Sequence, residues 1–115
     1  MEWKKKQGNE GEEKAVEYLW NKEYKILERN WRCGHWEIDI IAEKDGILVF
    51  VEVKTWSGNM VAREIVSERQ MRTLIQAAEC YLQRQSRIME CRFDVILVRR
   101  VYSSYNIEHI ENAFR

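Results

Sequence analysis

The segment WEIDIIAEKDGILVFVEVKT, residues 36–55, decides the fold of this chain. Residues 36–43 and 46–55 are rich in β-branched and apolar side chains, as is typical of strands. Between them lies Asp45-Gly46, a dipeptide that favours the two-residue type I′ turn of a β-hairpin. The run over residues 47–51 is apolar without alternation, which predicts a central strand buried on both faces. The segment therefore predicts a hairpin inside a covered sheet.

The turn also fixes the expected register of the hairpin. Counting back from it places Asp39 directly opposite Glu52. Two residues further from the turn, Glu37 lies opposite Lys54. Because side chains alternate between the faces of a strand, all four are expected on one face, together with Ile41 and Phe50. Facing carboxylates repel each other, and a divalent cation with oxygen ligands would compensate them.

Patterns elsewhere predict one α/β domain over residues 1–115, with a mixed central sheet flanked by helices in the order α-β-β-β-α-β-β. Residues 1–8 read as a flexible tail, and Asn9 as the N-cap of a helix that ends near Asn21. The other expected elements are strands over 24–32, 93–98 and 105–110, the last at a sheet edge, a loop over 56–65, and a helix from a Ser67–Gln70 capping box to about Gln85.

Glu12 lies on the apolar stripe of the first helix. It has helical spacing with Ala15, Val16 and Leu19, so it should face the sheet. A buried carboxylate needs a partner, and the acidic face of the hairpin offers one. The alternative is a capping-box glutamate that reaches back to Asn9. Its agreement with the other three site residues favours the acidic site.

Composition limits the possible functions. Nineteen basic residues balance nineteen acidic ones, which counts mildly against nucleic acid as a partner. The three cysteines, scattered and odd in number, argue against a disulfide framework and a zinc site and favour a cytoplasmic setting. No apolar run has membrane-spanning length, so no membrane partner is expected. His35 and His109 lack ligand spacing and are expected to be structural or exposed.

Several short motifs together resemble the YraN family of bacterial proteins. They are GEEKA at 11–15, EIDII at 37–41, VEVKT at 51–55 and RFDV at 92–95, with Asn30 between the first two. That family is similar to archaeal Holliday-junction resolvases and to other nucleases with a D…E-x-K motif. The resemblance covers nearly the whole chain and implies a restriction-endonuclease-like fold.

The resemblance also implies roles for individual residues. Asp39 and Glu52 would ligate Mg²⁺ or Mn²⁺, and the Val53 carbonyl would be a third ligand. Lys54 would orient the attacking water, and Glu12 would match the first-helix glutamate of the resolvases. Because resolvases cut two strands as symmetric dimers, a homodimer is expected here.

Two functional hypotheses follow. The first is a metal-dependent endonuclease that acts on DNA, including branched or flapped DNA, although nothing in the sequence separates DNA from RNA. The second is a non-catalytic nucleic-acid-binding or scaffold protein on the same fold. It gains support from Trp56 and Gln70, which stand where the family commonly has an arginine and a lysine. Glu37 either joins the acidic site or forms a salt bridge with Lys54.

Overall fold

A computed structural model describes residues 2–56, 66–86 and 88–114. Its elements are α1 (Glu2–Asn21), β1 (Lys25–Cys33), β2 (Trp36–Lys44), β3 (Ile47–Trp56), α3 (Glu68–Gln83), β4 (Glu90–Val101) and β5 (Ser104–Ile110). This confirms the predicted order α-β-β-β-α-β-β. Residues 57–65 of the expected loop lie outside the described residues. Across the described part of the chain, no helix has the length and apolar character needed to cross a membrane.

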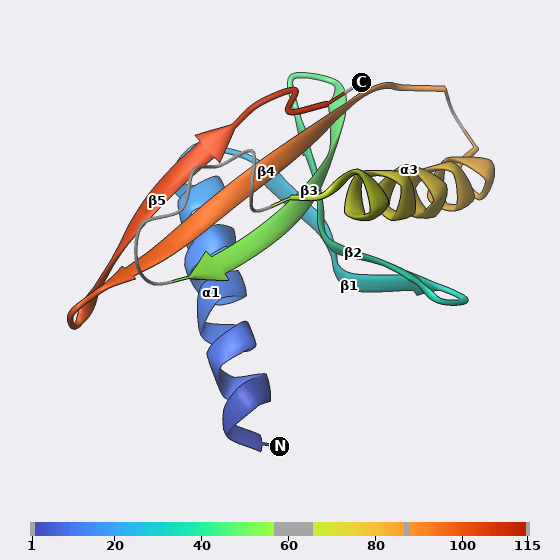
Figure 1. The fold of residues 1–115 in the computed structure, drawn as a ribbon. Coiled ribbons are helices and arrows are strands. Elements are labelled where there is room, and N and C mark those ends of the chain that lie inside the picture. The colour runs from blue at the N-terminus through green and yellow to red at the C-terminus, as the bar shows by residue number, and fades with distance from the viewer. Residues whose placement is uncertain (1, 57–65, 87, 115) are drawn as a thin grey trace.

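The strands form one mixed sheet with two covered faces (Figure 1). The strand order is β1-β2-β3-β4-β5, and β3 and β4 form the parallel pair. One core cluster joins α1 to the sheet through side chains that include Leu19 and Val51. A second joins α3 to side chains that include Phe50. Because consecutive residues of β3 belong to different clusters, the two helices pack on opposite faces, and β3 is the central buried strand that was predicted.

The β2–β3 hairpin has the predicted turn and register near its tip. Asp45 and Gly46 both have positive φ, 52° and 77°, as a type I′ turn requires. The pairing runs from Lys44 with Ile47 to the fifth pair, at residues 40 and 51. Beyond that point β3 stays paired with β4 as far as residue 56, whereas its pairing with β2 ends. The two predicted facing pairs, at residues 39/52 and 37/54, therefore fall where the hairpin arms separate.

The start of α1 differs from the prediction. The helix begins at Glu2 and runs through Asn9, so the predicted helix start at an Asn9 cap is wrong. Residues 4–7 are lysines and a glutamine, which favour helix, and the segment lacks proline. The N-terminal turns of α1 extend past the sheet (Figure 1). The capping-box alternative for Glu12 is excluded as well, because Asn9 lies inside the helix.

The start of α3 agrees with the prediction. The Gln70 N–H donates to the Ser67 hydroxyl at 3.2 Å, and the Ser67 N–H donates to Oε1 of Gln70 at 3.0 Å. This reciprocal capping box satisfies amides that the first turn would leave unpaired. The Gln70 side chain is therefore used in the helix cap, as predicted.

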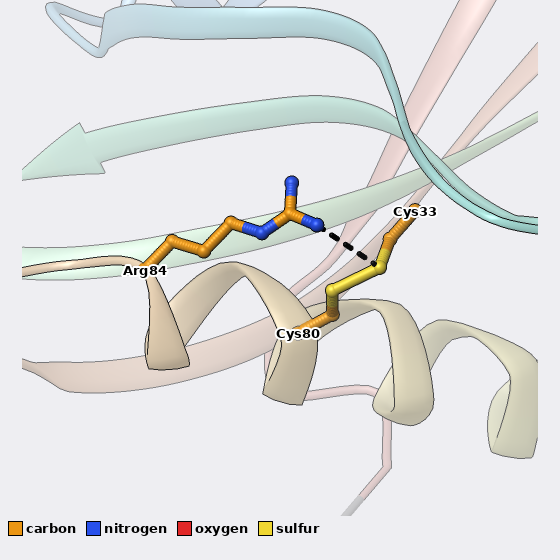
Figure 2. The surroundings of a disulfide bond; sticks show 3 residues. All are labelled: Cys33, Cys80 and Arg84. Carbon is orange, nitrogen blue, oxygen red and sulfur yellow. Dashed lines mark hydrogen bonds between the residues drawn. A yellow bond between two sulfur atoms is a disulfide. The ribbon is translucent and has the colours of Figure 1, made fainter.

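The cysteine prediction is wrong, because Cys33 and Cys80 form a disulfide (Figure 2). The bond ties the end of β1 to α3 across 47 residues of sequence. Such a spacing gives no pairing signal, since only the packing of α3 on the sheet brings the two positions together. The Arg84 guanidinium donates to Sγ of Cys33 at 3.7 Å. Cys91 is free and exposed.

Reduction of this disulfide is expected to lower stability. Closing a loop of this length restricts the unfolded chain, and such bonds contribute about 2–4 kcal/mol. Urea unfolding with and without a thiol reductant measures the effect. Wild type and Cys91→Ser should lose stability on reduction, whereas Cys80→Ser should be less stable from the outset and insensitive to reductant. An unchanged wild-type midpoint in reductant would contradict the expectation.

Candidate active site

The candidate site lies where β2 separates from β3. Past the last ladder pair, the Val53 N–H donates to Oδ2 of Asp39 at 2.8 Å, so a side chain replaces the backbone partner. The N–H and C=O of one strand residue point to the same side of the strand. The Val53 carbonyl therefore faces the same gap. We call this point of separation the β2–β3 fork. It brings the Asp39 carboxylate and the Val53 carbonyl to the same gap.

Strict alternation of side chains breaks down at Asp39. Ile38 and Ile41 both pack in the cluster on the α3 side of the sheet, whereas Ile40 packs on the α1 side. A regular strand would place Ile38 and Ile40 on the same face. Ile41 and Phe50 share one face, as predicted. Because β2 is irregular at Asp39, counting alternate residues does not give the face of the residues that precede it.

Asp39 and Glu52 form a half-buried carboxylate pair at the point where β2 and β3 separate. Burial raises the pKa of Asp39, and the charge of Glu52 raises it further. Burial likewise raises the pKa of Glu52, and this outweighs the hydrogen bond from Asp39 and the positive charge of Lys54, which both lower it. Two carboxyls in this setting are stable when they share a proton or bind a cation. The pair is thus the electrostatic centre of the site.

Lys54 and Glu37 are both near this pair, but they do not pair with each other. Lys54 is close enough to Glu52 to favour its charged form. Glu37 instead accepts a hydrogen bond from Nε of Arg32 at 3.0 Å, and Arg32 is its direct cross-strand neighbour in β1. The proposed Glu37–Lys54 salt bridge is therefore wrong. Counting along the hairpin could not predict the Arg32–Glu37 pair, because that contact depends on β1 lying along the other edge of β2.

Glu12 of α1 also lies near the Asp39–Glu52 pair. Glu12, Asp39, Glu52 and Lys54 are called the acidic cluster below. Burial and the charge of Asp39 raise the pKa of Glu12, while a hydrogen bond from Asn30 lowers it. Its Oε1 is buried without a hydrogen-bond partner. The preceding residue, Gly11, packs against Thr55 of β3 so closely that a Cβ would collide with the Thr55 hydroxyl. Glycine at this position lets α1 approach β3 and brings Glu12 to the carboxylate pair.

The donor atoms suit a hard divalent cation. Asp39, Glu52 and the Val53 carbonyl offer oxygens, and the unpartnered Oε1 of Glu12 lies in the same acidic cluster. In the part of the chain that the structure describes, no group of three or more Asp, Glu, His or Cys side chains is arranged to hold a metal ion. Mg²⁺ is commonly bound by one or two carboxylates while it keeps several waters, so an open site of this kind fits it.

The carboxylate pair makes a prediction about pH. Because the pKa of Asp39 is raised in the folded chain, that state keeps a proton that the unfolded chain loses above about pH 4. The stability linked to this carboxyl is full at low pH and is lost as the pH rises toward the folded-state pKa. Asp39→Asn should therefore stabilise the metal-free fold by about 1–3 kcal/mol near pH 8.

Thermal melts in EDTA, taken from acid to alkaline pH, measure this difference. Wild type should lose melting temperature as the pH rises, and Asp39→Asn should lose much less. Glu108→Gln, at an exposed position on β5, is the matched control and should follow wild type. Parallel curves for Asp39→Asn and wild type would contradict the assignment of the pair.

A second buried polar cluster lies beneath the C-terminal part of α1 and was not predicted. Asp94 is fully buried and binds Arg92 through two contacts of 2.9 Å. Its Oδ2 also lies 2.7 Å from Nε2 of His109, and its Oδ1 accepts the Asn112 N–H at 3.0 Å. Arg92 donates to the Tyr24 hydroxyl at 2.8 Å.

This cluster is structural. Burial raises the pKa of Asp94, but the hydrogen bonds from His109, Arg92 and the Asn112 amide together outweigh it and hold the pKa below its usual value. The expectation that His109 is structural is therefore confirmed, since its side chain is 6% exposed. The RFDV motif at 92–95 contains two members of the cluster, and their spacing on one strand face was the only signal that the sequence offered.

Comparisons with known proteins agree with the motifs. The sequence profile of the family described as "Uncharacterised protein family UPF0102" matches residues 11–98. The chain is 44% identical over 110 residues to a UPF0102 protein of Persephonella marina, covering 93% of this chain and 91% of that protein. It is 39% identical over 109 residues to a UPF0102 protein of Phocaeicola vulgatus, covering 93% and 90%. The chain therefore belongs to the protein family UPF0102, the YraN family that its motifs resemble.

Proposed function

We propose that this protein is a divalent-metal-dependent endonuclease that hydrolyses phosphodiester bonds in DNA. The observation that carries the proposal is the half-buried Asp39–Glu52 pair at the β2–β3 fork, with Lys54 beside it. Two carboxylates held together against their repulsion are unfavourable for a purely structural role. They are favourable where a cation must be bound next to a phosphate.

Each residue of the cluster would have a defined part. Bound Mg²⁺ or Mn²⁺ would polarise a phosphoryl oxygen and lower the pKa of a water. Asp39, Glu52 and the Val53 carbonyl would hold the ion. The Lys54 ammonium would orient the attacking water and stabilise the negative charge that develops on the phosphoryl oxygens. Oε1 of Glu12, which lacks a partner, would accept a hydrogen bond from water beside the ion.

The proposal extends to substrate form and assembly. The described part of the chain carries one such cluster, and one cluster would cut one strand. Cleavage of both strands of a branched or flapped DNA would therefore use two copies, as a symmetric homodimer provides. A cytoplasmic location remains part of this proposal, but the Cys33–Cys80 disulfide removes the cysteine argument for it, because such a bond would be reduced there unless it is protected.

A non-catalytic nucleic-acid-binding or scaffold role is the second candidate. The balanced charge of the chain favours the scaffold form of this role, because it counts against nucleic acid as a partner. Gln70 is neutral and serves as a helix cap, and Arg32 is paired with Glu37, so neither offers a free cation to the phosphates that a nuclease must hold. The nucleic-acid-binding form would bind nucleic acid with a steep salt dependence and without cleavage.

Cleavage of end-labelled DNA tests the proposal. Duplex, flap, four-way-junction and single-stranded substrates, with an RNA of matched sequence, would be incubated with Mg²⁺, Mn²⁺ or EDTA. We expect cutting with either metal and none with EDTA. Binding without cutting in every condition would favour the second candidate. The absence of both binding and cutting would support neither a nuclease nor a nucleic-acid-binding protein.

A further inference from the structure

The backbone of β1 has an uncommon conformation at Asn30. Its φ is +50°, in the left-handed region that asparagine tolerates better than most residues. Consecutive side chains of a regular strand point to opposite faces. Here Arg29 forms an ion pair with Glu13 of α1 at 2.7 Å, and the next residue, Asn30, lies close enough to Glu12 of the same helix for its side-chain amide to lower the pKa of that carboxyl. The left-handed residue lets two consecutive side chains of β1 reach one helix.

The register of β1 places Asn30 beside the candidate site. The residues on either side of it pair with Ile40 and Ile38 of β2, so Asn30 lies across from Asp39. Its backbone therefore lies beside Asp39, while its amide, on an exposed side chain, is close to the Glu12 carboxyl. Non-glycine residues with positive φ are uncommon and gather at functional sites, where the surrounding structure maintains them.

The chemistry of the contact suits a support for a metal-binding carboxylate. Since Oε1 of Glu12 has no partner, the Asn30 amide is left to interact with the other carboxylate oxygen. An amide donor at one oxygen of Glu12 restricts rotation of the carboxylate and keeps the other oxygen, Oε1, directed at the acidic cluster. A neutral amide does this without cancelling the negative charge, which a lysine or arginine would do.

We propose that Asn30 is the positioning residue for Glu12: its left-handed backbone turns the amide toward α1, and the amide holds the Glu12 carboxylate toward Asp39 and Glu52. The proposal rests on the proposed metal-dependent function. It assigns Asn30 no contact with the metal or the DNA.

Three variants separate the side chain from the backbone. Asn30→Gly accepts the positive φ and removes only the amide. Asn30→Asp keeps the shape and replaces the donor with a carboxylate that repels Glu12. Asn112→Gly is the matched control, because Asn112 has a φ of 53° and lies outside the acidic cluster.

Mn²⁺ binding by calorimetry is the first measurement. Loss of a supporting hydrogen bond typically weakens metal binding about 10–100-fold, and we expect this for Asn30→Gly, with a larger loss for Asn30→Asp. Asn30→Gly should unfold at the same temperature as Asn112→Gly. A purely structural role would instead lower its melting temperature and leave Mn²⁺ affinity unchanged, which would overturn the proposal.

The second measurement needs no metal. Nuclear magnetic resonance of the metal-free protein should show that the side-chain amide protons of Asn30 exchange with water more slowly than those of Asn112, and Glu12→Ala should remove the difference. Exchange that is indifferent to Glu12→Ala would overturn the proposal. Wild type that binds no Mn²⁺ would overturn the metal-dependent function as well, whereas equal binding by wild type and Asn30→Gly would overturn the positioning role alone.

Discussion

Asp39→Asn and Lys54→Ala are each expected to reduce metal-dependent DNA cleavage by about 100–1,000-fold, the loss typical when a charged group that stabilises the transition state is removed. The amide oxygen introduced by Asp39→Asn would still accept the Val53 N–H, so the backbone at the fork should persist. This variant would lack the charge that a divalent ion requires. Rates of cleavage under single-turnover conditions, in saturating Mg²⁺ and then Mn²⁺, measure both effects.

The two variants should differ in metal binding. Asp39→Asn should lose Mn²⁺ affinity together with activity, whereas Lys54→Ala should retain affinity and lose activity. Glu108→Ala and Lys25→Ala are matched controls at exposed strand positions and should cleave at the wild-type rate. Unimpaired cleavage by Asp39→Asn would refute the assignment of the fork as the active site.

Asp94→Asn is expected to destabilise the protein by about 3–5 kcal/mol, because removal of one member of a buried ion pair leaves the other without compensation. Arg92 would remain in the cluster with a side chain that is only 20% exposed. The His109 and Asn112 contacts to the carboxylate would also weaken. Urea unfolding at neutral pH measures the loss.

A graded comparison isolates the buried contact. Glu111, the other partner of Arg92 at 3.3 Å, has a side chain that is 60% exposed. Glu111→Gln should therefore change stability by no more than about 1 kcal/mol. The lowered pKa of Asp94 also predicts that its contribution is present above the unfolded-state pKa and is lost as the pH falls through the folded-state pKa. Equal effects of Asp94→Asn and Glu111→Gln would show that the cluster does not act as a buried unit.

Much of the fold can be predicted from local patterns. The Asp45-Gly46 turn, the unbroken apolar run of β3 and the Ser67–Gln70 box each act over a few residues, and the structure confirms all three. The position of Glu12 on the inner stripe of α1 was also readable, because helical spacing alone determines it.

The errors have a common physical origin in contacts between distant parts of the chain. The Cys33–Cys80 disulfide, the Arg32–Glu37 pair and the Asp94 cluster depend on which elements pack together, and spacing within one segment does not encode that. The N-terminal extension of α1 was missed for a different reason. A plausible cap residue at Asn9 was given more weight than the helix propensity of the residues before it.

The hairpin that carries Asp39 and Glu52 has a consequence for folding kinetics. Hairpins form locally within about 1–10 μs, whereas the parallel β3–β4 pair must wait for a long crossover. The two carboxylates therefore meet while water still screens them, and their repulsion grows only when α1 and β4 close the core. Relief of that repulsion, as in Asp39→Asn, should slow unfolding and leave the folding rate nearly unchanged. The acidic fork thus limits how long the metal-free chain stays folded, not how fast it folds.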